Sequence, residues 1–238
     1  MTKEFRIEKE IDLAATPEQV WAAITTAAGT ETWLWSTPGD LRPEVPLVAT
    51  WDQPEHLLVK MPAAEDGSVQ AFEYVIEGRD GATTVLRFVH SGVMADSWEG
   101  EDQELTGAGW DMYLDTLAQY FLHFAGSPAT YVCVQAPESS VSAGAWPALL
   151  RALGVDGAAA VGKRVKLDLP GAAPVEGVID YARSTFLGLR TSDALYRFHG
   201  RMPIGLPIAV GAYVYGRPVD REALTAAWTA WLADVFHA

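Results

Sequence analysis

Residues 16–24 read TPEQVWAAI, and this stretch decides how the N-terminal half is expected to fold. Thr16 is a favourable helix N-cap, and Pro17 suits the first helical position. Gln19 stands three residues after the cap, where a capping box places Glu or Gln. The predicted helix has an apolar face made of Val20, Trp21 and Ile24. The stretch therefore predicts a short helix with a well-defined start.

A strand is predicted directly before this helix. Residues 5–13 read FRIEKEIDL, in which polar and apolar residues mostly alternate. One face of such a strand would carry Phe5, Ile7, Ile11 and Leu13. The chain thus opens with a half-buried strand that runs into a sharply capped helix.

This opening resembles that of the START-like superfamily, also called the Bet v 1-like, SRPBCC or helix-grip fold. Within that group it is most similar to the homologues of the activator of Hsp90 ATPase. A second stretch, TGAGWDMYLDTL at residues 106–117, resembles the closing helix of the same family. The resemblance covers residues 3 to about 125. It implies an α+β fold in which an antiparallel sheet curls around a long C-terminal helix and encloses a cavity.

The rest of the N-terminal half agrees with that fold. Strands are predicted at residues 47–52, 56–61, 69–77 and 83–90, separated by short turns with no helix between them. Residues 91–104 are polar and acidic and are predicted to form a loop. The pattern then becomes helical from about residue 105 to 124, with one apolar face formed by Trp110, Leu114, Leu117, Phe121 and Phe124.

Gly126, Ser127 and Pro128 end this helix and mark the predicted domain boundary, giving domains 1–127 and 128–238. The second half repeats the order of the first. It has a strand at 130–135, a short helix at 146–153, strands at 164–169, 175–181, 186–190, 195–199 and 208–215, and a closing helix after Asp220. We therefore predict two helix-grip domains in tandem, the second a degenerate copy. An α+β appendage without that topology is the alternative.

The amino-acid composition excludes some classes of binding partner. The 238 residues carry 31 acidic and 17 basic side chains, a formal net charge of −14. A protein with this negative charge repels phosphate backbones and anionic membranes, so nucleic acids and membranes are not expected partners. No apolar run is long enough for a membrane helix. The single cysteine, Cys133, is expected to be buried and inert in a cytoplasmic protein.

No catalytic motif is evident. The sequence has no nucleophile elbow, phosphate loop or metal-binding cysteine pair, and its five histidines are scattered without ligand spacing. We therefore predict no catalytic residue, no metal and no cofactor.

The resemblance assigns the cavity walls to aromatic and apolar residues. The closing helix would contribute Trp110, Tyr113, Leu114 and Leu117, and the sheet would contribute Trp51, Phe72, Tyr74, Phe88 and His90. Three tryptophans, Trp33, Trp35 and Trp98, would border the entrance. An apolar wall with a few polar groups is typical of small-molecule pockets, although the same rings could simply fill a core.

Three functions stay open at this point. The first is a non-enzymatic carrier or sensor of a hydrophobic small molecule. The second is a cyclase, dehydratase or hydrolase that uses His90 or Tyr74 as acid or base. The third is a co-chaperone-like module that binds an Hsp90-type ATPase. A homodimer is open as well. We rank the binder first.

Overall fold

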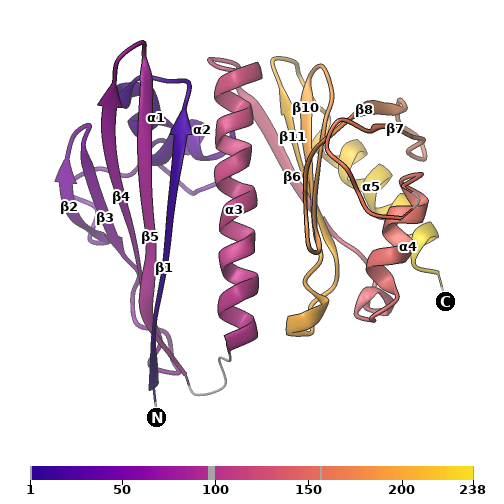
Figure 1. Ribbon diagram of the computed structural model, residues 1–238, viewed down its shortest axis with the longest axis horizontal. Helices are drawn as coiled ribbons and strands as arrows, with labels where there is room; N and C mark the ends of the chain where they lie inside the picture. Colours follow the sequence, from indigo (N-terminus) through magenta and orange to yellow (C-terminus); the bar gives the residue numbers. More distant parts are fainter. Residues whose placement is uncertain (1, 96–99, 156, 238) are drawn as a thin grey trace. The chain divides into compact units, whose positions relative to one another are not determined.

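The computed structural model describes residues 2–95, 100–155 and 157–237. The chain divides into two compact units, Met1–Gly126 and Ser127–Ala238, which are treated separately below (Figure 1). Among the described residues, no helix combines the length and the apolar character needed to cross a membrane.

The N-terminal unit is an antiparallel sheet with three helices. Its elements are β1 (Thr2–Leu13), α1 (Pro17–Thr25), α2 (Ala27–Thr30), β2 (Val48–Asp52), β3 (His56–Lys60), β4 (Val69–Arg79), β5 (Thr83–Ala95) and α3 (Gly100–His123). The strand order is β1-β5-β4-β3-β2, so the first strand pairs with the last one and the long helix follows.

The predicted capping box starts α1. The Gln19 amide nitrogen donates to the Thr16 hydroxyl at 3.4 Å, and the Thr16 amide nitrogen donates to the Gln19 side chain at 2.9 Å. These bonds satisfy backbone groups that a helix start leaves without partners. The apolar face of α1 is buried, as predicted, through Val20, Trp21 and Ile24.

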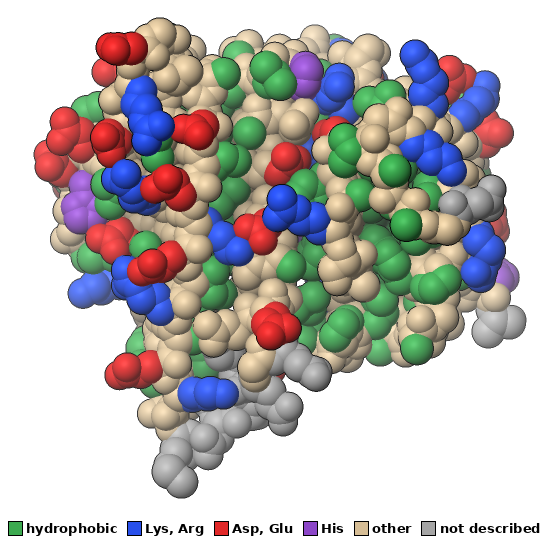
Figure 2. All heavy atoms as spheres, viewed as in Figure 1, with side chains coloured by type: hydrophobic (Ala, Val, Ile, Leu, Met, Phe, Trp, Pro, Cys, Tyr) green, Lys and Arg blue, Asp and Glu red, His purple; other side chains and the backbone are tan. Residues whose placement is uncertain are grey.

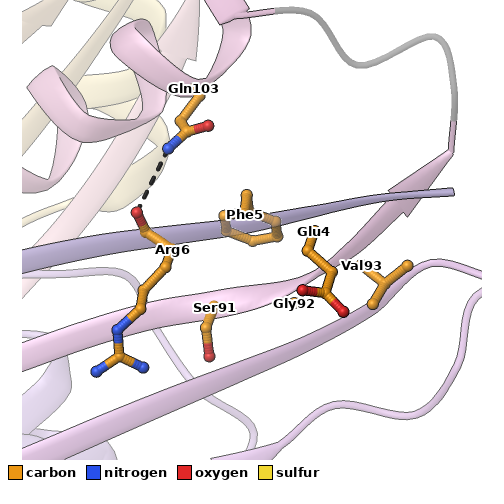
Figure 3. Close-up of a pocket in the computed structure, with 7 residues that line it drawn as sticks. All are labelled: Glu4, Phe5, Arg6, Ser91, Gly92, Val93 and Gln103. Atoms are coloured by element: carbon orange, nitrogen blue, oxygen red, sulfur yellow. Dashed lines mark hydrogen bonds between the residues drawn. The ribbon is translucent and has the colours of Figure 1, made fainter.

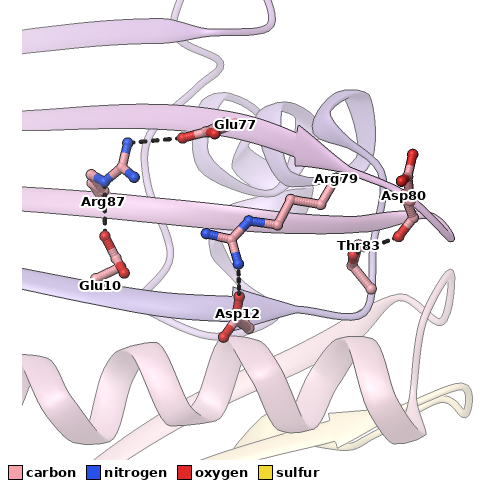
Figure 4. A network of polar contacts seen from close by, with 7 residues as sticks. All are labelled: Glu10, Asp12, Glu77, Arg79, Asp80, Thr83 and Arg87. Atoms are coloured by element: carbon pink, nitrogen blue, oxygen red, sulfur yellow. Dashed lines mark hydrogen bonds and ion pairs between the residues drawn. The ribbon is translucent and has the colours of Figure 1, made fainter.

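The two faces of this sheet differ in chemistry because side chains alternate along each strand. On the outer face, Arg87 of β5 lies between Glu10 of β1 at 2.8 Å and Glu77 of β4 at 3.0 Å (Figure 4). Arg79 reaches Asp12 at 3.5 Å on the same face. The inner face is apolar and aromatic.

The prediction of a loop at residues 91–104 is largely wrong. β5 continues to Ala95 because its pairing with β1 extends to the register Thr2↔Ala95, and α3 begins already at Gly100. Backbone pairing across two strands therefore overrides the polar character of this stretch. Trp98, which was predicted to border the cavity entrance, lies outside the described residues.

The C-terminal unit has the same order of elements with one more strand. It contains β6 (Ala129–Gln135), the 3-10 turn η1 (Glu138–Ser140), α4 (Ala145–Ala152), β7 (Arg164–Leu167), β8 (Val175–Arg183), β9 (Phe186–Arg190), β10 (Ala194–His199), the 3-10 turn η2 (Met202–Ile204), β11 (Ala209–Tyr215) and α5 (Arg221–Val235). Its strand order is β6-β11-β10-β9-β8-β7, and again the first strand pairs with the last.

One face of the second sheet packs its apolar side chains with those of α4 and α5. Trp228 of α5 is fully buried there and contacts Tyr196 and Phe198 of β10 at ring-centroid distances of 5.3 and 5.8 Å. Trp231 also lies inward, at 5.6 Å from Trp228. A strand, a short helix, an antiparallel sheet and a closing helix thus occur in both units, which confirms the predicted tandem helix-grip fold class.

Cys133 is exposed, so the expectation that it would be buried is wrong. Its neighbours Val132 and Val134 point into the core of the C-terminal unit. Since side chains alternate along a strand, the residue between them lies on the opposite face.

A buried ion pair joins two strands of the C-terminal sheet. Both terminal nitrogens of Arg197 on β10 donate to the two carboxylate oxygens of Asp180 on β8, at 2.9 and 3.1 Å. The two side chains are 0% and 5% exposed. Gly188 lies between them on β9 and leaves room for the pair, because a Cβ there would lie 2.4 Å from the guanidinium.

Candidate functional site: an aromatic layer in the N-terminal unit

The inner face of the N-terminal sheet carries a continuous layer of aromatic rings. The register places Phe72 opposite His90, and Tyr74 opposite Phe88, on neighbouring strands β4 and β5. Trp110 of α3 packs onto them, with its ring centroid 4.3 Å from that of Phe88 and 5.8 Å from that of Phe72. Ring pairs at these separations contribute specific contacts beyond area burial.

Hydrogen bonds fix the protonation state of His90. The indole nitrogen of Trp110 is only a donor, so His90 Nδ1, at 3.0 Å, must accept from it. His90 Nε2 then carries the proton and donates to the Gln70 side-chain oxygen at 2.8 Å. Burial lowers the pKa of His90 to about 4, which favours the same neutral ring.

This arrangement gives His90 a structural role. Both of its nitrogens are engaged, so in this conformation neither is free to exchange a proton with a bound molecule. Burial also raises the pKa of Tyr74, which keeps its hydroxyl protonated. The two side chains that could have acted as acid or base are therefore held in neutral forms.

The aromatic layer reaches the surface at Trp35. Its ring meets Tyr113 of α3 edge to face at 5.8 Å and lies 6.4 Å from Trp110. Trp35 is 42% exposed, whereas Trp110 is 6% exposed. Trp35, which was predicted to border a cavity entrance, therefore lies at the exposed edge of the aromatic layer.

Two other predicted lining residues, Trp33 and Trp51, contact α1. Trp33 is fully buried and donates its indole N–H to the Ala23 carbonyl at 3.0 Å, so it does not border an entrance as predicted. Its loop folds back onto α1, which the sequence pattern did not reveal. Trp51 meets Trp21 of α1 edge to face at 4.9 Å. Leu114 and Leu117 of α3 are buried.

Two hollows on this unit lie along β1 and the start of α3. One of about 470 Å³ is lined by Glu4, Phe5, Arg6, Ser91, Gly92, Val93 and Gln103 (Figure 3). Another of about 580 Å³ adjoins it and includes the ion pair between Lys9 and Asp111 at 2.7 Å. Neither is lined by a residue of the predicted cavity. The Gln103 side chain bridges strand and helix by donating to the Arg6 carbonyl at 3.3 Å.

No metal centre is formed by the described residues, since they include no group of three or more His, Cys, Asp or Glu side chains placed to hold an ion.

No protein-family model matches the sequence, and no curated protein matches it significantly. Among solved structures, CalU16 from Micromonospora echinospora is 18% identical over 51% of this chain and 86% of its own, with a TM-score of 0.38. The Aha1 dimer from Colwellia psychrerythraea is 20% identical over 51% and 99%, with a TM-score of 0.38. DynU16, from the dynemicin biosynthetic locus, is 14% identical over 97% of both chains, with a TM-score of 0.41.

The assignment of the helix-grip topology to each unit rests on the strand orders and closing helices described above.

Proposed function

We propose that the N-terminal unit binds a hydrophobic small molecule against its aromatic layer, as a carrier or sensor, and that the ligand enters at Trp35. The observation that carries this proposal is the continuity of the layer from the exposed ring of Trp35 to the buried rings of Trp110 and Phe88. An exposed tryptophan in edge-to-face and tilted contact with further aromatic rings provides an apolar contact surface.

The polar groups of the layer set the chemistry of this ligand. Trp110, His90 and Gln70 satisfy one another, so they offer a ligand no free donor or acceptor without rearrangement. The Tyr74 hydroxyl makes no hydrogen bond with the described residues and remains available. The layer therefore suits a mainly apolar or aromatic molecule with at most one or two oxygen atoms.

The enzymatic alternative is less well supported, because both nitrogens of His90 are engaged by Trp110 and Gln70, and burial raises the pKa of Tyr74, which disfavours its deprotonation. A binding role needs neither group to titrate.

The proposal is tested by titrating the full-length protein with an environment-sensitive apolar fluorophore. We expect a dissociation constant in the low micromolar range, roughly −8 kcal/mol, and quenching of tryptophan emission. Trp35→Ala should weaken binding by about tenfold or more, because it removes the ring that a ligand meets first. Leu206→Ala is the matched control, since Leu206 is 43% exposed but lies in the C-terminal unit.

Equal affinity of wild type, Trp35→Ala and Leu206→Ala would show that the fluorophore binds elsewhere and would contradict the proposed site. A protein-binding role would then become the leading explanation of this fold.

A further inference from the structure

A second feature, in the C-terminal unit, is a hollow with a surplus of positive charge. It measures about 500 Å³ and lies over β7, β8 and the end of β9. Its cationic side chains are Arg164, Lys166 and Arg190, and Glu176 is the one carboxylate among its lining residues. Figure 2 shows Lys and Arg side chains in the region of β7 and β8, with Asp and Glu side chains next to them. This local charge is opposite to that of the chain, whose formal net charge is −14.

The arginines of this hollow have no partner of their own. Most described arginines form an ion pair, a carbonyl hydrogen bond or a ring contact, as Arg217 does with Asp193 and Arg201 with the Pro207 carbonyl. The described arginines without any such interaction are Arg151, Arg164 and Arg190. Two of these three line the same hollow.

Of the two arginines in this hollow, Arg190 is the one whose side chain contains a buried donor without an acceptor. Its Nε atom is buried, yet it has no acceptor among the described residues. A buried donor that is left unsatisfied costs about 1–3 kcal/mol, and more for a charged group. A bound acceptor would remove this cost.

The register brings the two arginines to one side of the sheet. Arg164 of β7 pairs with Val178 of β8, and Val178 pairs with Arg190 of β9. Residues directly opposite one another across a sheet share a face, and two strand spacings separate the backbones of the two arginines by about 10 Å. Extended arginine side chains can converge on one group over that distance.

The remaining lining residues are compatible with an anion. Lys166 already neutralises Glu176 at 2.6 Å, so this carboxylate does not oppose a bound negative charge. Ser192, in the turn after β9, adds an exposed hydroxyl that no described residue engages.

From these observations we propose that the hollow between Arg164 and Arg190 binds the oxyanion group of a small molecule, a carboxylate or a phosphate. Guanidinium groups bind both through paired N–H donors, which gives orientation as well as charge. The site is separate from the aromatic layer of the N-terminal unit and does not depend on its function.

The test uses inorganic phosphate and acetate as probes on the full-length, ¹⁵N-labelled protein at low ionic strength. We expect either anion to shift the Arg190 Nε–H signal with an affinity on the order of millimolar. A stronger shift with phosphate identifies a phosphate-bearing ligand, and an equal or stronger shift with acetate identifies a carboxylate-bearing one.

Arg164→Gln and Arg190→Gln should each weaken binding by about tenfold. In the Arg190 variants, which lack the Nε–H, binding is followed on the backbone amide signals of residues 190–192 that line the hollow. Arg190→Lys keeps the positive charge but removes the paired N–H donors of the guanidinium. It should therefore bind the anion more tightly than Arg190→Gln but less tightly than the wild type. Arg151→Gln is the matched control, because Arg151 is equally unpartnered but lies on α4, outside the hollow. The proposal is overturned if neither anion shifts the Arg190 signal, or if Arg151→Gln weakens binding as much as Arg164→Gln.

Discussion

His90 shows how single residues define the aromatic layer. Its ring is stacked on Phe72 at 4.5 Å and touched at its edge by Phe5 at 4.8 Å, while Trp110 and Gln70 occupy its two nitrogens. Burial and hydrogen bonding thus select one neutral tautomer. The sequence indicated which strand face His90 occupies, but the partners of its nitrogens come from α3 and β4 and could not be predicted from local spacing.

This neutral state predicts a pH dependence of stability. Burial lowers the pKa of His90 to about 4 and that of His199 to about 3, against 6.5 for a free ring. As the pH falls, the two histidines therefore become protonated in the unfolded chain before they do so in the folded protein. Stability is highest above pH 6.5 and should fall as the pH drops, by about 1.4 kcal/mol per pH unit for each histidine.

The measurement is the free energy of unfolding by urea between pH 5 and 6.5. His90→Gln keeps an acceptor for Trp110 and should reduce the slope by the contribution of one histidine, whereas His237→Gln, at an exposed position, should leave it unchanged. An unaltered slope in His90→Gln would mean that His90 is not held neutral.

Gly188 is a second residue whose role follows from close approach. A Cβ at this position would lie 2.4 Å from Arg197 and 2.6 Å from Asp180, so Gly188→Ala should displace the buried ion pair. Loss of such a pair leaves charges buried without partners, and we expect destabilisation by about 3–5 kcal/mol.

Gly144→Ala provides the control for this substitution, because Gly144 has a φ of −83° and a methyl group added there would meet no atom within 4 Å. It should change stability by no more than about 1 kcal/mol, far less than Gly188→Ala. Similar denaturation midpoints for Gly188→Ala and wild type would contradict the packing described for Arg197.

At the scale of elements, β5 has one face in the apolar core and one face exposed to solvent. Phe88 points inward and is fully buried, whereas the adjacent Arg87 points outward to Glu10 and Glu77. The alternation that sorts these residues was visible in the sequence. The end of β5 was not, because it depends on pairing with β1 over the whole length of both strands.

This contrast can be measured on neighbouring residues. Phe88→Ala should destabilise the protein by about 3–5 kcal/mol, because it opens a cavity beneath Trp110. Arg87→Ala should have a much smaller effect that disappears in high salt, since exposed ion pairs are screened. Thermal denaturation at low and high salt distinguishes the two. Comparable losses would mean that the outer ion pairs contribute as much as the core.

For the whole molecule, the tandem helix-grip fold could be predicted because local patterns mark elements of each unit. The capping box identifies α1 in the first unit, and the Asp220 cap identifies the closing helix α5 in the second. The site was harder to predict. Trp35 and Trp33 are two residues apart, yet one is exposed beside Tyr113 and the other is buried against α1. The positions of Arg164 and Arg190 depend on the register of three strands, with an irregularity in β8 between Ile179 and Tyr181.

The central claim is that an apolar ligand binds the aromatic layer of the N-terminal unit, and the indole N–H signals of the nine tryptophans test it most directly. On adding an apolar probe to the full-length protein, we predict that the signals of Trp35 and Trp110 shift. Trp228 and Trp231, in the core of the C-terminal unit, should not shift. Shifts confined to Trp228 and Trp231, with Trp35 and Trp110 unchanged, would contradict the account.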